Sequence, residues 1–483
     1  MATRKDRDPV EYPSARLSAT RTTLAELARL GRWSEANKTV LDTLGLIQAG
    51  PAGVTAPELA GLVYIAGGPR PDPARRIVGE RVAVPDERPA SMRALLLVNR
   101  IGDRDEAVAT AEAVLASPGR REVGTFWHAI LTLVYSDRVD IARDHCEQAA
   151  EDPAWTQTPR YRDALTLLRA RLAYLDGEPL VAVGLFSRLL AGGVFPQLHS
   201  LAVAWTVAAL VDFGEVEDAT ELLHQHGFDG VLTDAGDRAE LLWARGLLQE
   251  AAGRPQAACE EFLSCGRELL RWAVINPAVI PWRSAAARCA RAVDRTDLAV
   301  ALAREELMEA HRWGTASAVG KALWVDALVS EDPATDELLR TAAELLEQSG
   351  EKYEIRHVLY TLGSRLNLEG RFDEGEQALL GAREIARQTG NKYCVECIDA
   401  VLELWRPDGP FRSLSTQEFR VAHLARSGFS NKEIAERMHV ALRTVELYLS
   451  TVYRKLGISR RSGLASTIIP RWGLSEPLKH YRM

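Results

Sequence analysis

The stretch Gly214-Glu-Val-Glu-Asp-Ala219 is one copy of a turn signature that decides the fold of most of this chain. The signature is a Gly or Asp, a mainly polar stretch, and an Ala five positions after the start, replaced by Gly375 in the last copy. Each copy predicts a turn between two helices. The copies lie at residues 31–36, 102–107, 137–142, 177–182, 214–219, 253–258, 294–299 and 370–375.

The spacing of these copies indicates a repeat array. From the copy at 102–107 to the copy at 294–299, the signature recurs at a period of roughly 40 residues. The interval between the last two copies is about twice as long and spans two repeats, with a degenerate turn near Glu331-Asp-Pro333. The interval between the first two copies likewise spans a weak repeat at Gly67-Gly-Pro-Arg-Pro71. Two helices and a turn repeated at this period predict an all-α, TPR-like helical-repeat superhelix, in which each pair buries an apolar face against the next.

The C-terminal residues show the pattern of a helix-turn-helix. Ser415 lies three residues before Glu418, and Ser430 lies three residues before Glu433, so both pairs predict a capping box that starts a helix. Gly428 follows the first of these helices, where a left-handed C-cap is expected. The second helix is short and carries Ile434, Ala435 and Met438 towards a small core.

A third helix has two distinct faces. One face predicts a buried stripe of Val445, Leu449, Val452 and Leu456. The opposite face suits the major groove of DNA, which admits a helix. On this face Arg443, Arg454 and Lys455 suit phosphates, while Glu446, Leu447 and Ser450 suit base edges. The alternative is an ordinary amphipathic helix with a solvated polar face, which the two capped helices before it and the local charge disfavour.

The charge distribution supports contact with a polyanion. Residues 411–483 contain 13 Lys and Arg and 5 Asp and Glu, a balance of +8. Since the whole chain carries −7, residues 1–410 carry −15. A basic C-terminal module on an acidic body is typical of a protein that approaches DNA through that module alone.

Residues 414–464 resemble the LuxR-type helix-turn-helix. The residues that match its pattern are Leu414, Ser415, Glu418, Gly428, Ser430, Asn431, Glu433, Ile434, Ala435, Thr444, Val445, Glu446, Lys455, Leu456, Ile458 and Arg461. The resemblance implies a four-helix module that binds DNA as a dimer on paired half-sites, with its third helix in the major groove. The predicted DNA contacts are Asn431, Lys432, Arg443, Thr444, Glu446, Leu447, Ser450, Arg454 and Lys455.

Three positions depart from the family pattern. Tyr448 replaces the usual His, Ala441 replaces the Ser or Thr that caps the third helix, and Pro470 falls where the fourth helix is expected. An Ala at an N-cap costs about 1 kcal/mol of helix stability. The fourth helix often forms the dimer contact, so Pro470 leaves the mode of dimerisation open.

The repeats just before this module include residues 337–347, 356–363 and 370–379. These segments resemble the helical repeats of the large ATP-binding LuxR-family regulators. Of that family's three parts, this chain is expected to hold two: the helical superhelix that senses an inducer and the DNA-binding module. No Gly-x4-Gly-Lys-[Ser/Thr] phosphate loop occurs, and Gly320-Lys-Ala322 lacks the hydroxyl and upstream Gly. The predicted parts are an N-terminal arm at 1–20, the array at 21–405, a Pro- and Gly-rich linker at 406–413, the DNA-binding domain at 414–475 and a tail at 476–483.

Other residues that could bind a metal or a ligand have a structural alternative. Cys394 and Cys397 share one helical face, where packing is favoured over metal or redox chemistry, and His224 and His226 flank a turn. Several tryptophans could fill the repeat core or line a concave ligand pocket: Trp243, Trp272, Trp282, Trp313 and Trp324. No nucleophile–base set or metal cluster is evident, so neither enzyme activity nor a cofactor is predicted.

These observations predict a sequence-specific transcription regulator, an activator in the first instance, whose repeat body senses a small-molecule or protein effector. The expected partners are promoter half-sites in double-stranded DNA, RNA polymerase and a second copy of the chain. The charged N-terminus lacks a signal peptide, and the longest apolar stretch, Leu201 to Val211, is about half a membrane span. A bacterial cytoplasmic protein that associates with the nucleoid is therefore expected, and no membrane contact. The alternatives are a helical-repeat scaffold with an accessory DNA-binding module, and a ligand-controlled repressor.

Overall fold

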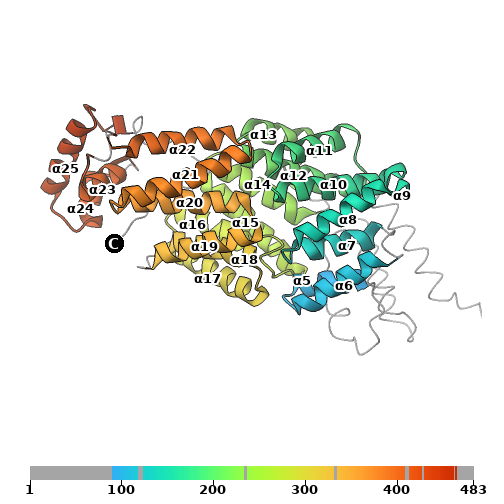
Figure 1. The fold of residues 1–483 in the computed structure, drawn as a ribbon. Helices are drawn as coiled ribbons and strands as arrows, with labels where there is room; N and C mark the ends of the chain where they lie inside the picture. Colours follow the sequence, from blue (N-terminus) through green and yellow to red (C-terminus); the bar gives the residue numbers. More distant parts are fainter. Residues whose placement is uncertain are drawn as a thin grey trace, which may run out of the picture.

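The chain folds as a succession of α-helices that winds into an elongated array and ends in a smaller helical module (Figure 1). The computed structural model describes residues 90–117, 123–232, 237–330, 334–407, 409, 413–426, 429–461 and 463–464. These residues contain 21 helices and no strand. The all-α prediction is therefore confirmed.

The helices of the array run from α5 to α22, and those of the C-terminal module are α23 to α25. Their bounds are α5 Ala90–Asn99, α6 Arg104–Ala116, α7 Val123–Val134, α8 Val139–Glu151, α9 Pro153–Gln157, α10 Pro159–Leu175, α11 Pro179–Ala191, α12 Pro196–Phe213, α13 Val216–Gln225, α14 Arg238–Ala251, α15 Pro255–Arg271, α16 Trp282–Ala292, α17 Thr296–Trp313, α18 Ala316–Val329, α19 Thr335–Ser349, α20 Lys352–Leu368, α21 Phe372–Gln388, α22 Lys392–Trp405, α23 Thr416–Arg426, α24 Asn431–Arg437 and α25 Leu442–Lys455. None of these helices is long and apolar enough to cross a membrane.

Each turn signature from position 102 onward lies between the two helices of a pair, as predicted. In most copies the reason is the backbone conformation at the first residue. Gly177, Gly214, Gly253 and Gly370 have φ between 72° and 85°, and Asp137 and Asp294 have φ of 58° and 60°. Gly adopts this left-handed conformation without strain and Asp tolerates it better than most residues. The copies at 31 and 67, the turn at 331–333, Gly428 and Pro470 lie outside the described residues.

The Ala of the signature is a small residue buried in the packing of each helix pair. It has no exposed surface in any described copy: Ala107, Ala142, Ala182, Ala219, Ala258 and Ala299. In the last copy even a methyl group does not fit, because a Cβ on Gly375 would lie 2.9 Å from the carbonyl oxygen of Gly363 in α20 and would also meet the Asn367 side chain. Gly375 therefore allows α20 and α21 to pack backbone against backbone.

Contacts between residues far apart in the chain show that successive turns of the superhelix touch. Trp313 donates its indole N–H to the carbonyl of Tyr135 (2.8 Å, 178 residues apart), and the Asn391 amide donates to the carbonyl of Asp212 (2.6 Å, 179 apart). Tyr174 stacks on Tyr353 with ring centroids 4.9 Å apart. With a repeat of roughly 40 residues, one superhelical turn thus takes between four and five repeats. We call this line of contact the seam.

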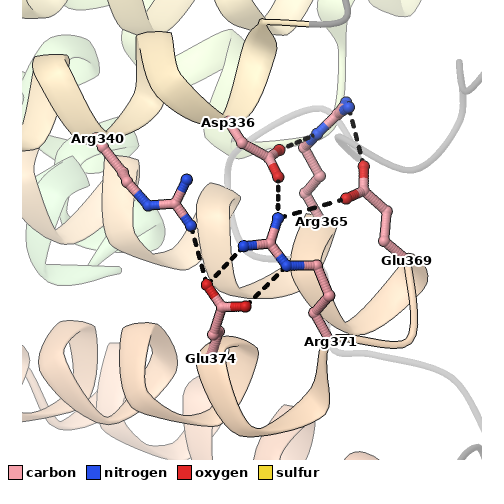
Figure 2. A network of polar contacts seen from close by, with 6 residues as sticks. All are labelled: Asp336, Arg340, Arg365, Glu369, Arg371 and Glu374. Atoms are coloured by element: carbon pink, nitrogen blue, oxygen red, sulfur yellow. Dashed lines mark hydrogen bonds and ion pairs between the residues drawn. The ribbon is translucent and has the colours of Figure 1, made fainter.

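The last repeats are tied together by a network of ion pairs that joins α19, α20 and α21 (Figure 2). Asp336 at the start of α19 accepts hydrogen bonds from Arg365 of α20 and from Arg371 in the following turn. Glu374 of α21 accepts from Arg371 and from Arg340 of α19. Single exposed ion pairs stabilise little, but here one carboxylate on each of two helices binds two arginines, which fixes the angle between the helices.

We predict that Gly375→Ala, although it restores the signature, destabilises the protein by about 1–3 kcal/mol because the added methyl group overpacks the α20–α21 contact. Gly184→Ala in α11 is the matched control. Its Cβ would meet nothing within 4 Å, so the change should stabilise by about 0.5–1 kcal/mol through helix propensity. Urea unfolding of both variants measures the difference, and equal effects would contradict the proposed close approach.

Candidate nucleic-acid interface

The C-terminal module, which we call the reader (residues 413–464), starts its first two helices with the predicted capping boxes. Ser430 donates its backbone N–H to the Glu433 carboxylate (2.7 Å), and Glu433 donates its own N–H to the Ser430 hydroxyl (3.3 Å). Ser415 and Glu418 form the same pair of bonds, at 2.6 and 3.3 Å. The Ser430 hydroxyl and amide lower the pKa of Glu433, so the carboxylate stays ionised.

The third helix, α25, is held by the predicted apolar stripe. Val445, Leu449 and Val452 are buried against α23 and α24, while Leu456 is only half-buried because the helix ends just before it. Ala441 precedes the helix and provides no side-chain cap. The turn from α24 is tight, because His439 adopts a left-handed backbone (φ 51°) and Val440 donates its N–H back to the carbonyl of Ala435.

The opposite face of α25 is exposed and mixes charge with apolar surface. Arg443, Glu446, Ser450 and Arg454 are all exposed. Leu447 lies among them with 63% of its surface exposed, and Leu442 at the helix start is 45% exposed. Exposed leucines on a short helix are costly in water, whereas an apolar side chain in the major groove meets thymine methyl groups. Figure 1 shows α25 at the outer end of the molecule, away from the array.

Two basic residues of the family pattern stabilise the reader itself. The Lys455 ammonium donates to the carbonyl of Ser413 (2.8 Å) and to the Glu418 carboxylate (2.6 Å), which joins the end of α25 to the start of α23. Burial alone raises the pKa of Glu418, but Lys455 and the Ser415 amide hold it below its usual value. Arg461 donates to the carbonyls of Ala425 and Phe429 and so clamps the chain between α23 and α24.

The remaining predicted contacts lie near α24 and at the start of α25. Lys432 is exposed, and Thr444 is half-buried. Asn431 is half-buried and accepts a hydrogen bond from Arg461 through its side-chain oxygen (3.1 Å). The exposed face of α25 thus brings together Arg443, Glu446, Leu447, Ser450 and Arg454, whereas Lys455 and Asn431 already have partners within the reader. Apart from the match of Arg461 to the family pattern, no signal in the sequence pointed to its clamp.

The reader packs directly on the last helix of the array. Trp405 at the end of α22 contacts Phe419 of α23 (ring centroids 5.0 Å apart) and Phe372 of α21 (5.9 Å). These rings belong to one apolar cluster that runs from α20–α22 into α23–α25. The linker is correspondingly tight, because a Cβ on Gly409 would lie 2.6 Å from the carbonyl oxygen of Leu404. The reader is therefore seated on the array by a shared core.

The cysteine and histidine residues noted in the sequence have local structural roles. Cys394 and Cys397 are both buried in the cluster under α22. His224 pairs with Asp229 (2.8 Å) and His226 with His199 (2.9 Å), so the two histidines have separate partners. Across the part of the chain that the structure describes, no group of three or more potential metal ligands occurs.

Comparison with known proteins identifies the reader. Residues 412–468 match the family described as "Bacterial regulatory proteins, luxR family". A protein named as an HTH-type transcriptional regulator, Mb0914c of Mycobacterium bovis, is 45% identical over 56 residues, which is 12% of this chain and 6% of its own. The oxygen regulatory protein NreC of Staphylococcus aureus is 38% identical over 55 residues, 11% of this chain and 25% of its own. The reader is a LuxR-family domain, and the similarity to these relatives spans only a small part of their length.

Among solved structures, the chain is similar to a Rap protein whose crystal structure contains the competence and sporulation factor. The match has 12% sequence identity and a TM-score of 0.49, and covers 78% of this chain and 99% of that one.

Lys455 and Arg454 provide a matched test of the interface, since they are neighbours on α25 with different surroundings. We predict that Lys455→Met lowers the stability of the reader by about 1 kcal/mol, because Glu418 loses its charged partner. Arg454→Met should change the stability of the reader by no more than about 0.5 kcal/mol. It should weaken DNA binding and reduce the slope of log affinity against log salt concentration by about one.

Amide hydrogen exchange of α23–α25 and DNA titrations at several salt concentrations separate the two effects. If Lys455→Met reduced the salt dependence of DNA binding as much as Arg454→Met and left hydrogen exchange unchanged, Lys455 would be a phosphate contact. The prediction that Lys455 stabilises the reader would then be wrong.

Proposed function

We propose that this protein is a sequence-specific DNA-binding transcription regulator whose helical-repeat body senses a ligand or protein partner and positions the LuxR-type reader. The observation that carries the proposal is the exposed face of α25, where two arginines flank Glu446, Leu447 and Ser450. The arginines suit backbone phosphates on either side of the groove, and the three residues between them suit base edges.

The shared core of α22 and the reader supports a sensing role for the body. A reader on a flexible tether would bind DNA independently of the array. Here Trp405 fixes it to α22, and Asn391 at the other end of α22 is hydrogen-bonded to Asp212 across the seam. A change at the seam therefore has a direct mechanical route to the DNA-binding surface.

The family resemblance supplies the rest of the proposal. LuxR-type readers act in pairs, so we infer that this protein binds paired promoter half-sites as a homodimer in the bacterial cytoplasm. Activation through contact with RNA polymerase is the favoured sign of regulation. The residues for which the resemblance implies a fourth helix and a dimer contact lie almost entirely outside the described residues.

Genome-wide occupancy of the full-length protein tests the function directly. We predict sharp peaks with a paired-half-site motif, lost in the Arg443→Glu, Arg454→Glu variant because both phosphate contacts become repulsive. Glu446→Ala, Ser450→Ala should instead shift or relax the motif, since those side chains face base edges. Diffuse occupancy that none of these changes alters, with cellular function retained, would favour a scaffold with an accessory reader.

The coupling of body and reader has its own test. We predict that Trp405→Leu leaves affinity for one isolated half-site within about threefold but weakens the preference for a fixed half-site spacing, because the reader is no longer held by α22. Trp272→Leu, just after the end of α15 and remote from the reader, is the control. Binding to operators of varied spacing distinguishes them, and an unchanged spacing preference in Trp405→Leu would contradict the coupling.

A further inference from the structure

A cavity of about 960 Å³ lies inside the array, between the two superhelical turns that meet at the seam. One wall comes from α10, α12 and α14, and the other from α18, α20 and the start of α22. This size matches that of sites for small organic ligands, which typically enclose about 300–1,000 Å³. A molecule in this cavity would touch both turns at once.

The acidic side chains on the inner walls of the cavity have partners in the protein. Glu250 binds Arg288 (2.9 Å), and Glu351 and Glu354 both bind Lys321 (2.6 and 3.4 Å). Asp212 accepts a hydrogen bond from the Tyr174 hydroxyl. Burial raises the pKa of Asp212 to about 6 and also raises the pKa of Glu240, an effect that the charge of Arg171 partly offsets.

Arg171 on α10 is the exception among these charged groups. It is half-buried in the cavity wall, and its guanidinium lies over the rings of Tyr174 (5.4 Å) and Trp205 (5.3 Å). Within the described residues it forms no ion pair and no side-chain hydrogen bond. Stacking on aromatic faces leaves the five N–H donors of an arginine pointing outward in its own plane. Such a group is pre-arranged to hold a carboxylate, sulfonate or phosphate.

The rest of the lining suits a flat apolar body. Trp205, Trp243 and Trp324 line the cavity from three helices, and Tyr174, Tyr353 and Tyr393 line it at the seam. Trp205 and Trp324 are held rigidly, since Trp205 stacks on Trp127 (6.1 Å) and the Trp324 indole N–H donates to Thr361 (3.1 Å). Trp205 and Trp324 are almost fully buried, so stacking on a planar ligand falls to the less buried rings of Trp243 and Tyr393.

We propose that this cavity binds a planar organic anion, whose charged group is held by Arg171 and whose ring system lies among Trp205, Trp243 and Trp324. The proposal deepens the proposed function, since it rests on the body acting as a sensor and names the chemistry that is sensed. The guanidinium of Arg171 supplies the positive charge and the hydrogen-bond donors. It lies against Tyr174 and Trp205, and its charge also acts on the carboxylates of Asp212 and Glu240.

The cavity lies where a bound ligand can affect the position of the reader. Tyr393, one residue into the last array helix, lines the cavity, and its ring packs against the turn at Gly214 across the seam. Asn391 caps the same helix through a hydrogen bond from the Cys394 amide and donates to Asp212. A ligand that spreads or tightens the seam thus acts on α22, whose other end carries Trp405 and the reader.

Two fluorescent probes that differ only in charge test the proposal on the full-length protein. 8-Anilinonaphthalene-1-sulfonate is an anion with a flat naphthalene ring, and N-phenyl-1-naphthylamine is the same ring system without the sulfonate. We expect one molecule of the anion per chain, bound at least tenfold more tightly than the neutral probe. Arg171→Met should weaken the anion at least tenfold and leave the neutral probe unchanged.

Arg188→Met, an exposed arginine of α11 outside the cavity, is the matched control and should leave both probes unaffected. Hydrogen exchange in the unmodified protein provides a readout that does not depend on a variant folding. The anion should slow exchange at residues 174–178 and 391–394, on the two sides of the seam. Several weak sites, equal binding of both probes, tighter binding of the planar cation 9-aminoacridine, or unchanged exchange at the seam would each overturn the proposal.

DNA titrations of the same protein distinguish failure of the anion site from failure of the proposed regulatory function. Specific DNA binding without probe binding would support the proposed DNA-binding regulator and contradict the proposed anion site. Probe binding that depends on Arg171, without specific DNA binding, would support the anion site and contradict the proposed function as a DNA-binding regulator.

Discussion

The structure depends on one repeated constraint, the packing of two helices around a small residue that is fully buried between them. Ala107, Ala219 and Ala299 occupy this position without exposed surface, and Gly375 takes it where even a methyl group is too large. A left-handed Gly or Asp sets the turn just before it in most copies. Together they fix the geometry of each pair, and because pairs stack on their neighbours, a small rotation per repeat accumulates into the superhelix.

The tightness of that superhelix creates both the seam and the cavity. Because residues as far apart in the chain as Asp212 and Asn391 meet, the array is closed along its length instead of presenting an open groove. Part of the seam is apolar, where Trp313 packs with Val98 and Tyr135, and the contacts of Asn391 and of the stacked Tyr174 and Tyr353 are polar and aromatic. The ion pairs around Asp336 and Glu374 bind α19, α20 and α21 into one unit (Figure 2). Because α20 lines the cavity, a movement of α20 carries α19 and α21 with it.

Local structure was predictable from the sequence wherever it depends on residues close in the chain. The turn signatures, the two capping boxes and the stripe of Val445, Leu449 and Val452 all follow from short spacings, and the structure confirms them. The seam was not predictable, because it depends on the sum of many small rotations. For the same reason no spacing showed that Trp205 and Tyr353 line one cavity, or that Arg171 faces it. The internal partners of Lys455 and Arg461 were not predicted, because a basic residue beside a DNA-binding helix is equally consistent with a phosphate contact.

The length of α22 makes small motions at the seam significant for DNA recognition. Its 14 residues span about 21 Å at 1.5 Å per residue. A tilt of roughly 10° about its seam end would move Trp405 by about 4 Å, close to the 3.4 Å rise of one base pair. In the proposed homodimer on paired half-sites, a shift of that size in each protomer would alter which half-site spacing fits. Since Trp405 and Phe419 share one core, the reader would follow this movement, and the proposed control of half-site spacing would need no large rearrangement of the array.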